Sequence, residues 1–152
     1  MKIKTEICAD GEEEIVIRCR SKTDKIKRIE EILEDLVMSD KEMVLHLSGT
    51  EYYVPIQDIL FFEALDSKVY AHTKDALFTC EYKLFELEAL LPSSFARISK
   101  SNIANVMLVA SLRREIVGNG EISFKGCDKR TYFSRSYYKI LRDKIDEMRL
   151  GK

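Results

Sequence analysis

Two segments near the N-terminus alternate apolar with polar side chains, and a helical pattern follows them. Residues 1–8 and 14–20 repeat with a period of two, which is typical of half-buried strands, and Asp10-Gly11 between them is a turn signal. Ser21 or Thr23 can then cap a helix whose apolar residues share one face: Ile26, Ile29, Leu33, Leu36 and Val37. The pattern predicts a small ββα unit.

The apolar stripe of this helix has to pack against another surface. The two strands before it are the simplest partner, because they lie next to it in the chain. A second copy of the chain or a regulatory protein is the alternative. We therefore expect residues 1–41 to form a dimerisation or regulatory unit in which the helix covers its own hairpin.

After residue 41 the pattern changes to short apolar runs separated by turn signals such as Ser48-Gly49, Asp66-Ser67 and Asn119-Gly120. These runs predict antiparallel strands at 43–47, 52–54, 59–65, 69–73, 76–82, 95–98, 106–112, 115–117, 121–124 and 131–133. Most of this region is therefore expected to be sheet.

Two amphipathic helices complete the second domain, which we place at residues 42–150. A short one begins at Leu84 and ends before Pro92, and a longer one spans about residues 134–148. The expected fold class is mostly β with flanking helices, α+β.

Composition limits the architecture, and the charge is unevenly distributed. A chain of 152 residues with 45% hydrophobic side chains buries one core with a small extension. The net charge is −1, yet 13 basic and 6 acidic residues follow position 96, which leaves 12 basic and 20 acidic residues before it. A basic half suits nucleic acid, because neutralised phosphates supply much of the affinity. A solvated basic helix is the alternative explanation of the same charge.

Metal and membrane signals are weak. The cysteines Cys8, Cys19, Cys80 and Cys127 form no Cys-x-x-Cys pair, so we expect reduced, partly buried thiols and no metal site. No apolar run approaches membrane-spanning length, and no signal peptide opens the chain. We expect a soluble, cytoplasmic protein.

Catalytic signals are also weak. The two histidines lie in separate strand-like segments outside any nucleophile, phosphate-loop or metal motif. His46 alternates with leucines and is expected on a solvent face. His72 with Asp66 or Asp75 is the combination that an enzyme would use, but carboxylates in turns are favoured for backbone hydrogen bonding alone. We expect neither catalysis nor a cofactor.

Two cationic segments are the strongest candidates for a site. The first places Lys100 between two serines at a bend after a strand, and such donors suit phosphate oxygens and base edges. The second places Arg135 after Ser134 in the first turn of the last helix, where a cation opposes the helix dipole. This position indicates a role outside the fold, and a helix start also binds phosphate. A surface ion pair is the alternative for Arg135.

Both segments belong to an ordered set of motifs that resembles a LytTR-type DNA-binding domain. The motifs are Tyr53–Ala64, Lys68–Thr73, Leu84–Glu88, Phe95–Asn105 and Phe133–Tyr137. They occur in family order over roughly residues 44–147. The resemblance implies a bacterial transcriptional regulator built of stacked small antiparallel sheets. It also implies that loops enter successive major grooves, usually at paired direct repeats.

The resemblance assigns contacts with double-stranded DNA to three loops. Lys100 and Arg135 match the family's principal contact positions, and Lys68 matches a third in a loop of variable length. The supporting residues are Arg97, Ser99, Ser101, Asn105, Ser134, Ser136, Tyr138 and Lys139. Lys100 lacks the bidentate fork of an arginine, which predicts looser base specificity. Asn105 is expected to organise its loop more than to read sequence.

Members of this family commonly carry an N-terminal phosphoacceptor receiver domain, and the residues before Met43 are too few for one. The chain therefore looks like a short, stand-alone, response-regulator-like subtype. We expect a homodimer, or docking of a small membrane protein that restrains the regulator, and no small-molecule substrate. A protein-interaction module with an incidental basic surface is the alternative function.

Overall fold

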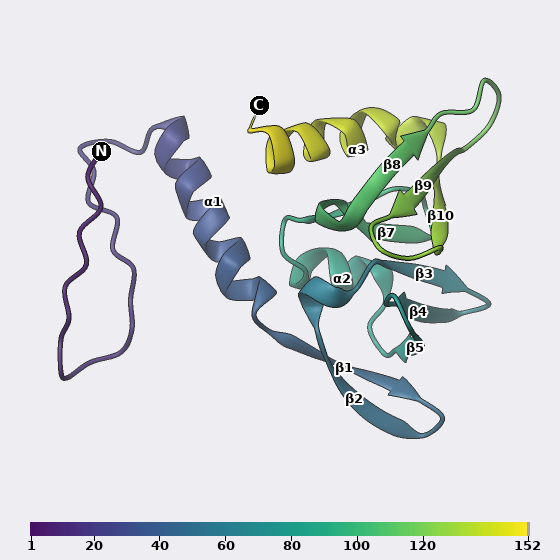
Figure 1. The fold of residues 1–152 in the computed structure, drawn as a ribbon, viewed down its shortest axis with the longest axis horizontal. Coiled ribbons are helices and arrows are strands. Elements are labelled where there is room, and N and C mark those ends of the chain that lie inside the picture. The colour runs from purple at the N-terminus through teal and green to yellow at the C-terminus, as the bar shows by residue number, and fades with distance from the viewer. Residues whose placement is uncertain (152) are drawn as a thin grey trace.

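The computed structural model describes residues 1–151, with Ser39 described by its backbone alone, and shows a β-rich body, a helix beside it and an N-terminal arm (Figure 1). We call residues 1–22 the arm. The helices are α1 (Asp24–Ser39), α2 (Leu84–Leu90) and α3 (Tyr138–Ile145), with the short helical turns η1 (Ile56–Asp58), η2 (Val106–Leu108), η3 (Arg135–Tyr137) and η4 (Asp146–Leu150). The strands are β1 (Glu42–Leu47), β2 (Thr50–Pro55), β3 (Phe61–Leu65), β4 (Lys68–His72), β5 (Leu77–Cys80), β6 (Phe95–Arg97), β7 (Asn102–Asn105), β8 (Val109–Arg113), β9 (Gly120–Phe124) and β10 (Arg130–Phe133).

The strands form two antiparallel sheets, which confirms the expected fold class. Seven strands pair in the order β2-β1-β5-β4-β3-β7-β6, and three pair in the order β10-β9-β8. Two-residue turns connect β1 to β2 and β3 to β4. In the second of these turns Asp66 and Ser67 both have positive φ, at 49° and 65°. Such turns match the right-handed twist of the strands.

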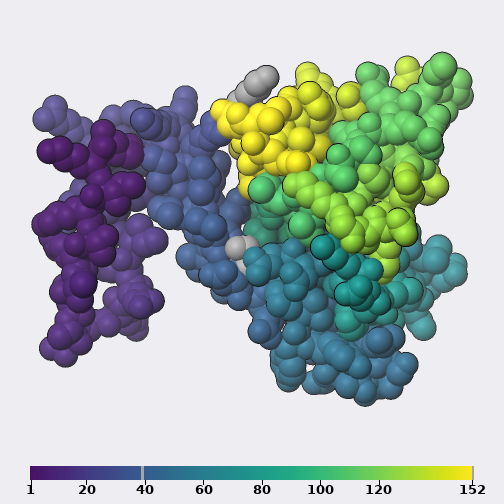
Figure 2. Space-filling view, viewed as in Figure 1, coloured from purple at the N-terminus to yellow at the C-terminus, as the bar shows by residue number. Residues whose placement is uncertain are grey.

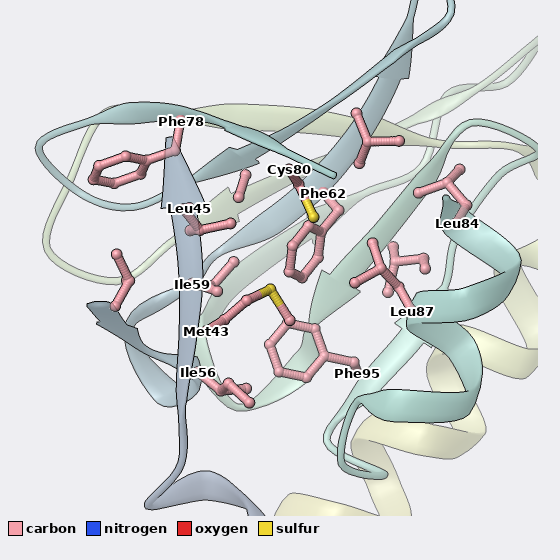
Figure 3. Close-up of a cluster of buried hydrophobic side chains, with 14 residues drawn as sticks. Met43, Leu45, Ile56, Ile59, Phe62, Phe78, Cys80, Leu84, Leu87 and Phe95 are labelled. Atoms are coloured by element: carbon pink, nitrogen blue, oxygen red, sulfur yellow. The ribbon is translucent and has the colours of Figure 1, made fainter. Parts of the chain in front are cut away.

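Two hydrophobic cores lie on opposite faces of the larger sheet. Successive side chains of a strand point to opposite faces, so Phe62 and Phe61 of β3 enter different cores. Phe62 packs with residues of β1, β5 and α2 (Figure 3), whereas Phe61 packs between the two sheets and α3. Both are almost fully buried, at 0% and 2% exposure, which stabilises the fold by roughly 1.5–3 kcal/mol for each side chain.

The two strands expected at residues 1–8 and 14–20 are absent from the structure, where the arm contains neither helix nor strand. Ile3 and Ile7 are each 96% exposed, so no other part of the chain covers the apolar side of this segment. An isolated two-stranded hairpin is marginal in water without a third strand or a packed face. Of the ββα unit, only the helix forms.

Helix α1 packs against the body instead of a hairpin of its own. Ile26 is 7% exposed. The Arg28 guanidinium donates to the Gly151 carbonyl at 3.0 Å, and Asp35 Oδ1 accepts from the Ser93 amide at 2.8 Å. The prediction that the helix covers its own hairpin is therefore wrong.

Three segments of the body also differ from their predicted state. Residues 106–108, expected at the start of a strand, form the helical turn η2. Residues 102–105, where no strand is predicted and Asn102 is expected in a bend, form β7 between β3 and β6, and all four are buried. A strand buried on both faces shows no alternation, and the asparagines at its ends are typical of turns. Residues 115–117, expected as a strand, lie in the β8–β9 connection, where Ile116 is 97% exposed.

The four cysteines are free thiols. Burial raises the pKa of the Cys80 thiol, and Cys127 is half-buried. Cys8 and Cys19 are exposed, contrary to the expected partial burial, because they lie in the arm. Within residues 1–151, no helix combines the length and apolar character needed to cross a membrane.

Candidate nucleic-acid interface

Three turns lie side by side at one end of the body. The Ala64 amide at the end of β3 donates to the Ser101 carbonyl at 2.7 Å, which joins the β3–β4 turn to the β6–β7 turn. The Ser134 amide donates to the Ile98 carbonyl at 2.9 Å, which joins the β6–β7 turn to the β10–η3 turn. We call this row the three-turn edge; it comprises residues 65–68, 98–101 and 133–136. The fold thus brings together segments that are far apart in sequence.

Arg97 holds the middle turn in shape. Its Nε donates to the Ser99 carbonyl at 2.8 Å, and Nη2 donates to the Lys100 carbonyl. Nη1 forms an ion pair with Glu88 Oε2 at 3.2 Å. The guanidinium therefore bonds within the protein on three sides, so we assign Arg97 a positioning role in presenting Lys100.

A buried polar link fixes the same turn to the smaller sheet. Ser101 Oγ donates to Asn102 Oδ1 at 2.9 Å, and Asn102 Nδ2 donates to Thr131 Oγ1 at 2.7 Å. Asn102 and Thr131 are only 7% and 3% exposed. Because an unpaired buried polar group costs about 1–3 kcal/mol, this bond strongly favours one placement of the turn. Ser99 Oγ adds a further bond by accepting from the Ser101 amide at 3.2 Å.

The third turn presents Arg135 and Ser136, which are both exposed. Ser134 occupies the N-cap position of η3, but its side chain makes no capping bond and instead lies 3.3 Å from the Ser136 hydroxyl. Helix α3 begins only at Tyr138. The turn η3 runs directly into α3, and the phosphate site expected at this helix start stays a prediction.

Tyr138 ties this turn to the β8–β9 connection. Its half-buried ring lies 5.6 Å from the Phe133 ring, centroid to centroid, and Arg114 Cζ lies 4.2 Å above it. A cation–π contact of this kind contributes about 0.5–1 kcal/mol. Arg114 is not among the predicted site residues. The only sequence signal at this position is that its neighbours, Arg113 and Glu115, are also charged. Lys139, one position after Tyr138, is exposed.

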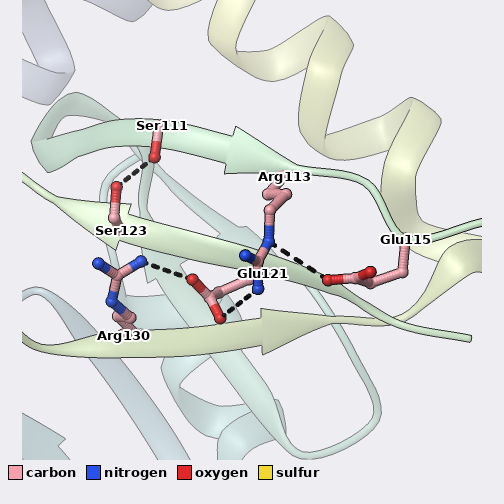
Figure 4. Close-up of polar contacts among 6 residues, drawn as sticks. All are labelled: Ser111, Arg113, Glu115, Glu121, Ser123 and Arg130. Carbon is pink, nitrogen blue, oxygen red and sulfur yellow. Dashed lines mark hydrogen bonds and ion pairs between the residues drawn. The ribbon is translucent and has the colours of Figure 1, made fainter.

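Four exposed cations at this end form no ion pair among residues 1–151: Lys68, Lys100, Arg135 and Lys139. The outer face of the smaller sheet is different (Figure 4). There Glu121 pairs with Arg113 at 3.1 Å and with Arg130 at 2.5 Å, and Glu115 pairs with Arg113 at 3.3 Å, so two carboxylates balance two guanidinium groups. The three-turn edge thus presents positive charge that is available to a polyanion.

Asn105 has an internal role, in line with the expectation that it organises its loop more than it reads sequence. Its side chain is 3% exposed, and Nδ2 donates to the Ile59 carbonyl at 3.2 Å. Oδ1 accepts from the Met107 amide at 3.1 Å and caps η2. The burial keeps the side chain away from any ligand at the surface and makes Asn105 a positioning residue.

His72 lies in a packed environment without the geometry of a catalytic pair. Its ring stacks on Phe61 with centroids 4.0 Å apart, and Nε2 lies 3.7 Å from Glu63 Oε1. Burial and then the nearby Lys129 ammonium lower the pKa of His72 to about 4. Asp66 is exposed in the β3–β4 turn. No group of three or more potential metal ligands occurs among the described residues.

Comparisons with known proteins show to which family the chain is similar. The family model of the LytTr DNA-binding domain matches residues 49–146. Two relatives from Staphylococcus aureus, strains bovine RF122 / ET3-1 and NCTC 8325 / PS 47, are both named uncharacterized HTH-type transcriptional regulator. They are 30% and 29% identical to this chain over 146 residues, which covers 95% of this chain and 98% of each relative.

A solved structure is also similar. The LytTr DNA-binding domain of a response regulator from Bacillus cereus superposes with a TM-score of 0.63 at 27% identity, over 69% of this chain and 96% of that chain. The match of the family model to most of the chain and the nearly full-length relatives identify the protein class. The chain belongs to the LytTR family of DNA-binding transcriptional regulators and is not an enzyme.

Proposed function

We propose that this regulator reads duplex DNA with the three-turn edge, as a homodimer at paired direct repeats. The observation that carries the proposal is the row of hydrogen-bonded turns that presents Lys68, Lys100 and Arg135 without acidic partners in the described chain. In this arrangement the two outer turns enter successive major grooves, and the middle turn faces the duplex between them. The major groove, about 12 Å wide, admits elements of this size.

The cations have different tasks in this arrangement. Arg135 offers a planar fork that can pair with guanine, whereas Lys100 and Lys68 act as point charges at a base edge or phosphate. Lys139 and the serine hydroxyls of the edge support the backbone contacts; the serines are Ser99, Ser101, Ser134 and Ser136. Tyr138, whose ring makes a cation–π contact with Arg114, positions the third turn.

The proposed division of labour places DNA binding in residues 42–150 and the pairing of copies in residues 1–41. Exposed apolar side chains support a protein partner for the second part: Ile32 of α1 is 47% exposed and Val37 is 59% exposed. A second copy is the partner proposed here, and a small membrane protein that restrains the regulator is the alternative. The protein acts in the cytoplasm, where the DNA lies.

Selection of bound sequences from random duplex DNA tests this function. We expect the wild-type chain to enrich two copies of one motif in the same orientation. In a mobility-shift assay on the selected DNA, Arg135→Ala should lose specific binding by about 10-fold or more, since a base-reading side chain contributes about 1–3 kcal/mol. Arg142→Ala is the matched control, because Arg142 lies on α3 and pairs with Asp146 at 3.6 Å.

Equal affinity of the Arg135→Ala and Arg142→Ala variants would reject the assignment. Enrichment of no motif, with weak binding to every duplex, would favour the interaction module with an incidental basic surface.

A further inference from the structure

Helix α1 is fastened to the body at two points along its length. Near its start, Arg28 donates to the carbonyls of Gly151 at 3.0 Å and Glu147 at 3.3 Å. Near its end, Asp35 accepts from both the amide and the hydroxyl of Ser93. Polar bonds therefore hold the helix to the body near both of its ends.

An open cavity of about 570 Å³ lies between α1 and the body. Its apolar wall includes Ile32 of α1, Phe95 of β6 and Met107 of η2. Ile32 is 47% exposed and Met107 is 41% exposed, so large apolar side chains border the opening. Protein interiors are normally packed with few voids larger than a water molecule, and a hollow of this size and character is suited to an apolar segment.

Two carboxylates also border the cavity. Asp35 and Asp58 line it together with the apolar wall. An occupant that combines apolar side chains with positive charge is therefore favoured over one that is purely apolar or acidic.

The arm contains a segment with this combination. Residues 15–20 place Ile15 and Ile17 ahead of Arg18 and Arg20 and contain no acidic side chain. Ile15 is 68% exposed in its own chain. In an extended conformation the isoleucines point to one side and the arginines to the other. The segment thus offers an apolar face and a basic face, which match the wall and the rim of the cavity.

The arm of the same chain lies on the wrong side of α1 to fill this cavity. Figures 1 and 2 show the arm, in purple, on the side of α1 that faces away from the body. At the base of the arm, Lys22 Nζ pairs with Glu30 Oε2 at 2.8 Å, which holds the chain against α1 where it leaves the helix. An arm that comes from another molecule reaches the cavity without crossing its own helix.

We propose that residues 15–20 of one copy occupy the cavity beneath α1 of a second copy. Ile15 and Ile17 lie against the apolar wall, and Arg18 and Arg20 approach the carboxylates at the rim. Each copy then places its arm in the cavity of the other, and this reciprocal exchange gives a closed dimer. The inference rests on the homodimer of the proposed function and specifies how its two copies are joined.

The arm carries its own chemical probe, because Cys19 is an exposed thiol next to the proposed contact. With Cys8 and Cys127 changed to serine, a chain that retains Cys19 is mixed with a longer, tagged chain that carries Cys19→Ser and Gln57→Cys. Gln57 is exposed and lines the cavity. On mild oxidation we expect a disulfide-linked pair of one short and one long chain. The matched control replaces Gln57→Cys by Lys125→Cys, an exposed position on the β9–β10 loop, and should give no linked pair.

Two results would overturn the inference. One is the absence of a linked pair with Gln57→Cys. The other is a single chain carrying both cysteines that closes on itself as a monomer, which would place each arm in its own cavity.

Sedimentation gives a second readout that does not depend on oxidation. We expect a dimer at micromolar concentration for the wild type and a monomer for the variant Ile15→Asp/Ile17→Asp, while Glu12→Ala/Glu13→Ala in the same arm stays dimeric. The arm lies outside both cores, so the circular dichroism spectra should agree. A monomeric wild type, or a dimeric Ile15→Asp/Ile17→Asp variant, contradicts the exchange. Mobility shifts on random duplex DNA report DNA binding separately, so failure of the arm exchange and failure of the proposed function can be told apart.

Discussion

The three-turn edge and the arm respond differently to the same kind of sequence pattern. Both regions place polar residues beside alternating apolar ones. At the edge, the backbone bonds of Ser101 and Ser134 and the buried pair Asn102 and Thr131 give each turn one position. The arm lacks such a network within residues 1–151, and Ile3 stays 96% exposed. Alternation becomes structure only where a neighbouring element can cover the apolar side.

The largest expected effect comes from filling the space under the third turn. A Cβ at Gly120 would overlap with the Phe133 ring, which is 2% exposed and cannot move into solvent freely. Gly120→Ala should therefore lower the free energy of unfolding by about 3 kcal/mol, as overpacked cores do. It should also displace the Ser134 turn and weaken DNA binding. Denaturant unfolding and a mobility shift measure the two effects.

Gly11→Ala in the arm is the contrasting substitution. No atom lies within 4 Å of the place that the alanine methyl group would take. The φ of 135° at Gly11 suits alanine poorly, but this backbone belongs to no helix, strand or core and can readjust. We expect a change below about 0.5 kcal/mol, the usual range for surface substitutions. A similar loss from both glycines would contradict the contrast between edge and arm.

Removing the buried link to the middle turn should have an intermediate effect. Asn102→Ala leaves the buried Thr131 hydroxyl without its 2.7 Å partner, which should lower the free energy of unfolding by about 2 kcal/mol. Ser101→Ala, at an exposed neighbour, should cost well under half as much. If the two variants unfold at the same denaturant concentration, the link does not hold the turn.

A further effect depends on pH and concerns the body alone, since both histidines lie there. The pKa of His72 is about 4 in the folded chain and about 6.5 when unfolded, so the unfolded chain binds more protons between these values. The contribution of neutral His72 is complete above pH 6.5 and is lost as the pH falls towards 4. After allowance for partial solvent access, the loss is about 1–2 kcal/mol.

Unfolding curves of the wild type and His72→Gln at several pH values measure this contribution. The difference between their free energies of unfolding should shrink between pH 6.5 and pH 4. A difference that does not change over this interval would show that His72 keeps an ordinary pKa.

Much of the sheet could be predicted from local pattern, and the failures have physical causes. Alternation locates most strands of the body, but it misses β7 because that strand is covered on both faces. The same alternation predicts strands in the arm. A sequence pattern shows which face of a strand would be buried, but it does not show whether another element is present to cover that face. Lys100 and Arg135 are candidates from their own segments, whereas Lys68 follows from the family resemblance alone.

The positioning residues are harder to foresee. The resemblance assigns Arg97 to a supporting DNA contact, whereas the structure uses its side chain for internal bonds. Asn105 is expected to organise its loop, and its buried side chain bonds to the Ile59 carbonyl. Asn102 and Thr131 are 29 positions apart, and Arg114 and Tyr138 are also distant in sequence. Such contacts depend on how the two sheets pack, and no local spacing encodes that packing.

The order of the three turns along DNA is the most direct test of the proposed reading mode. In a chain without the other exposed thiols, a DNA-cleaving iron chelate is attached at Leu65→Cys, Ser101→Cys or Ser136→Cys, one for each turn, and the protein is bound to its selected DNA. We expect the cuts from positions 65 and 136 to centre about 10 base pairs apart, one helical turn, with the cut from position 101 between them. Coincident cuts from all three positions, or cuts from position 101 outside the other two, would contradict a row of turns that spans successive major grooves.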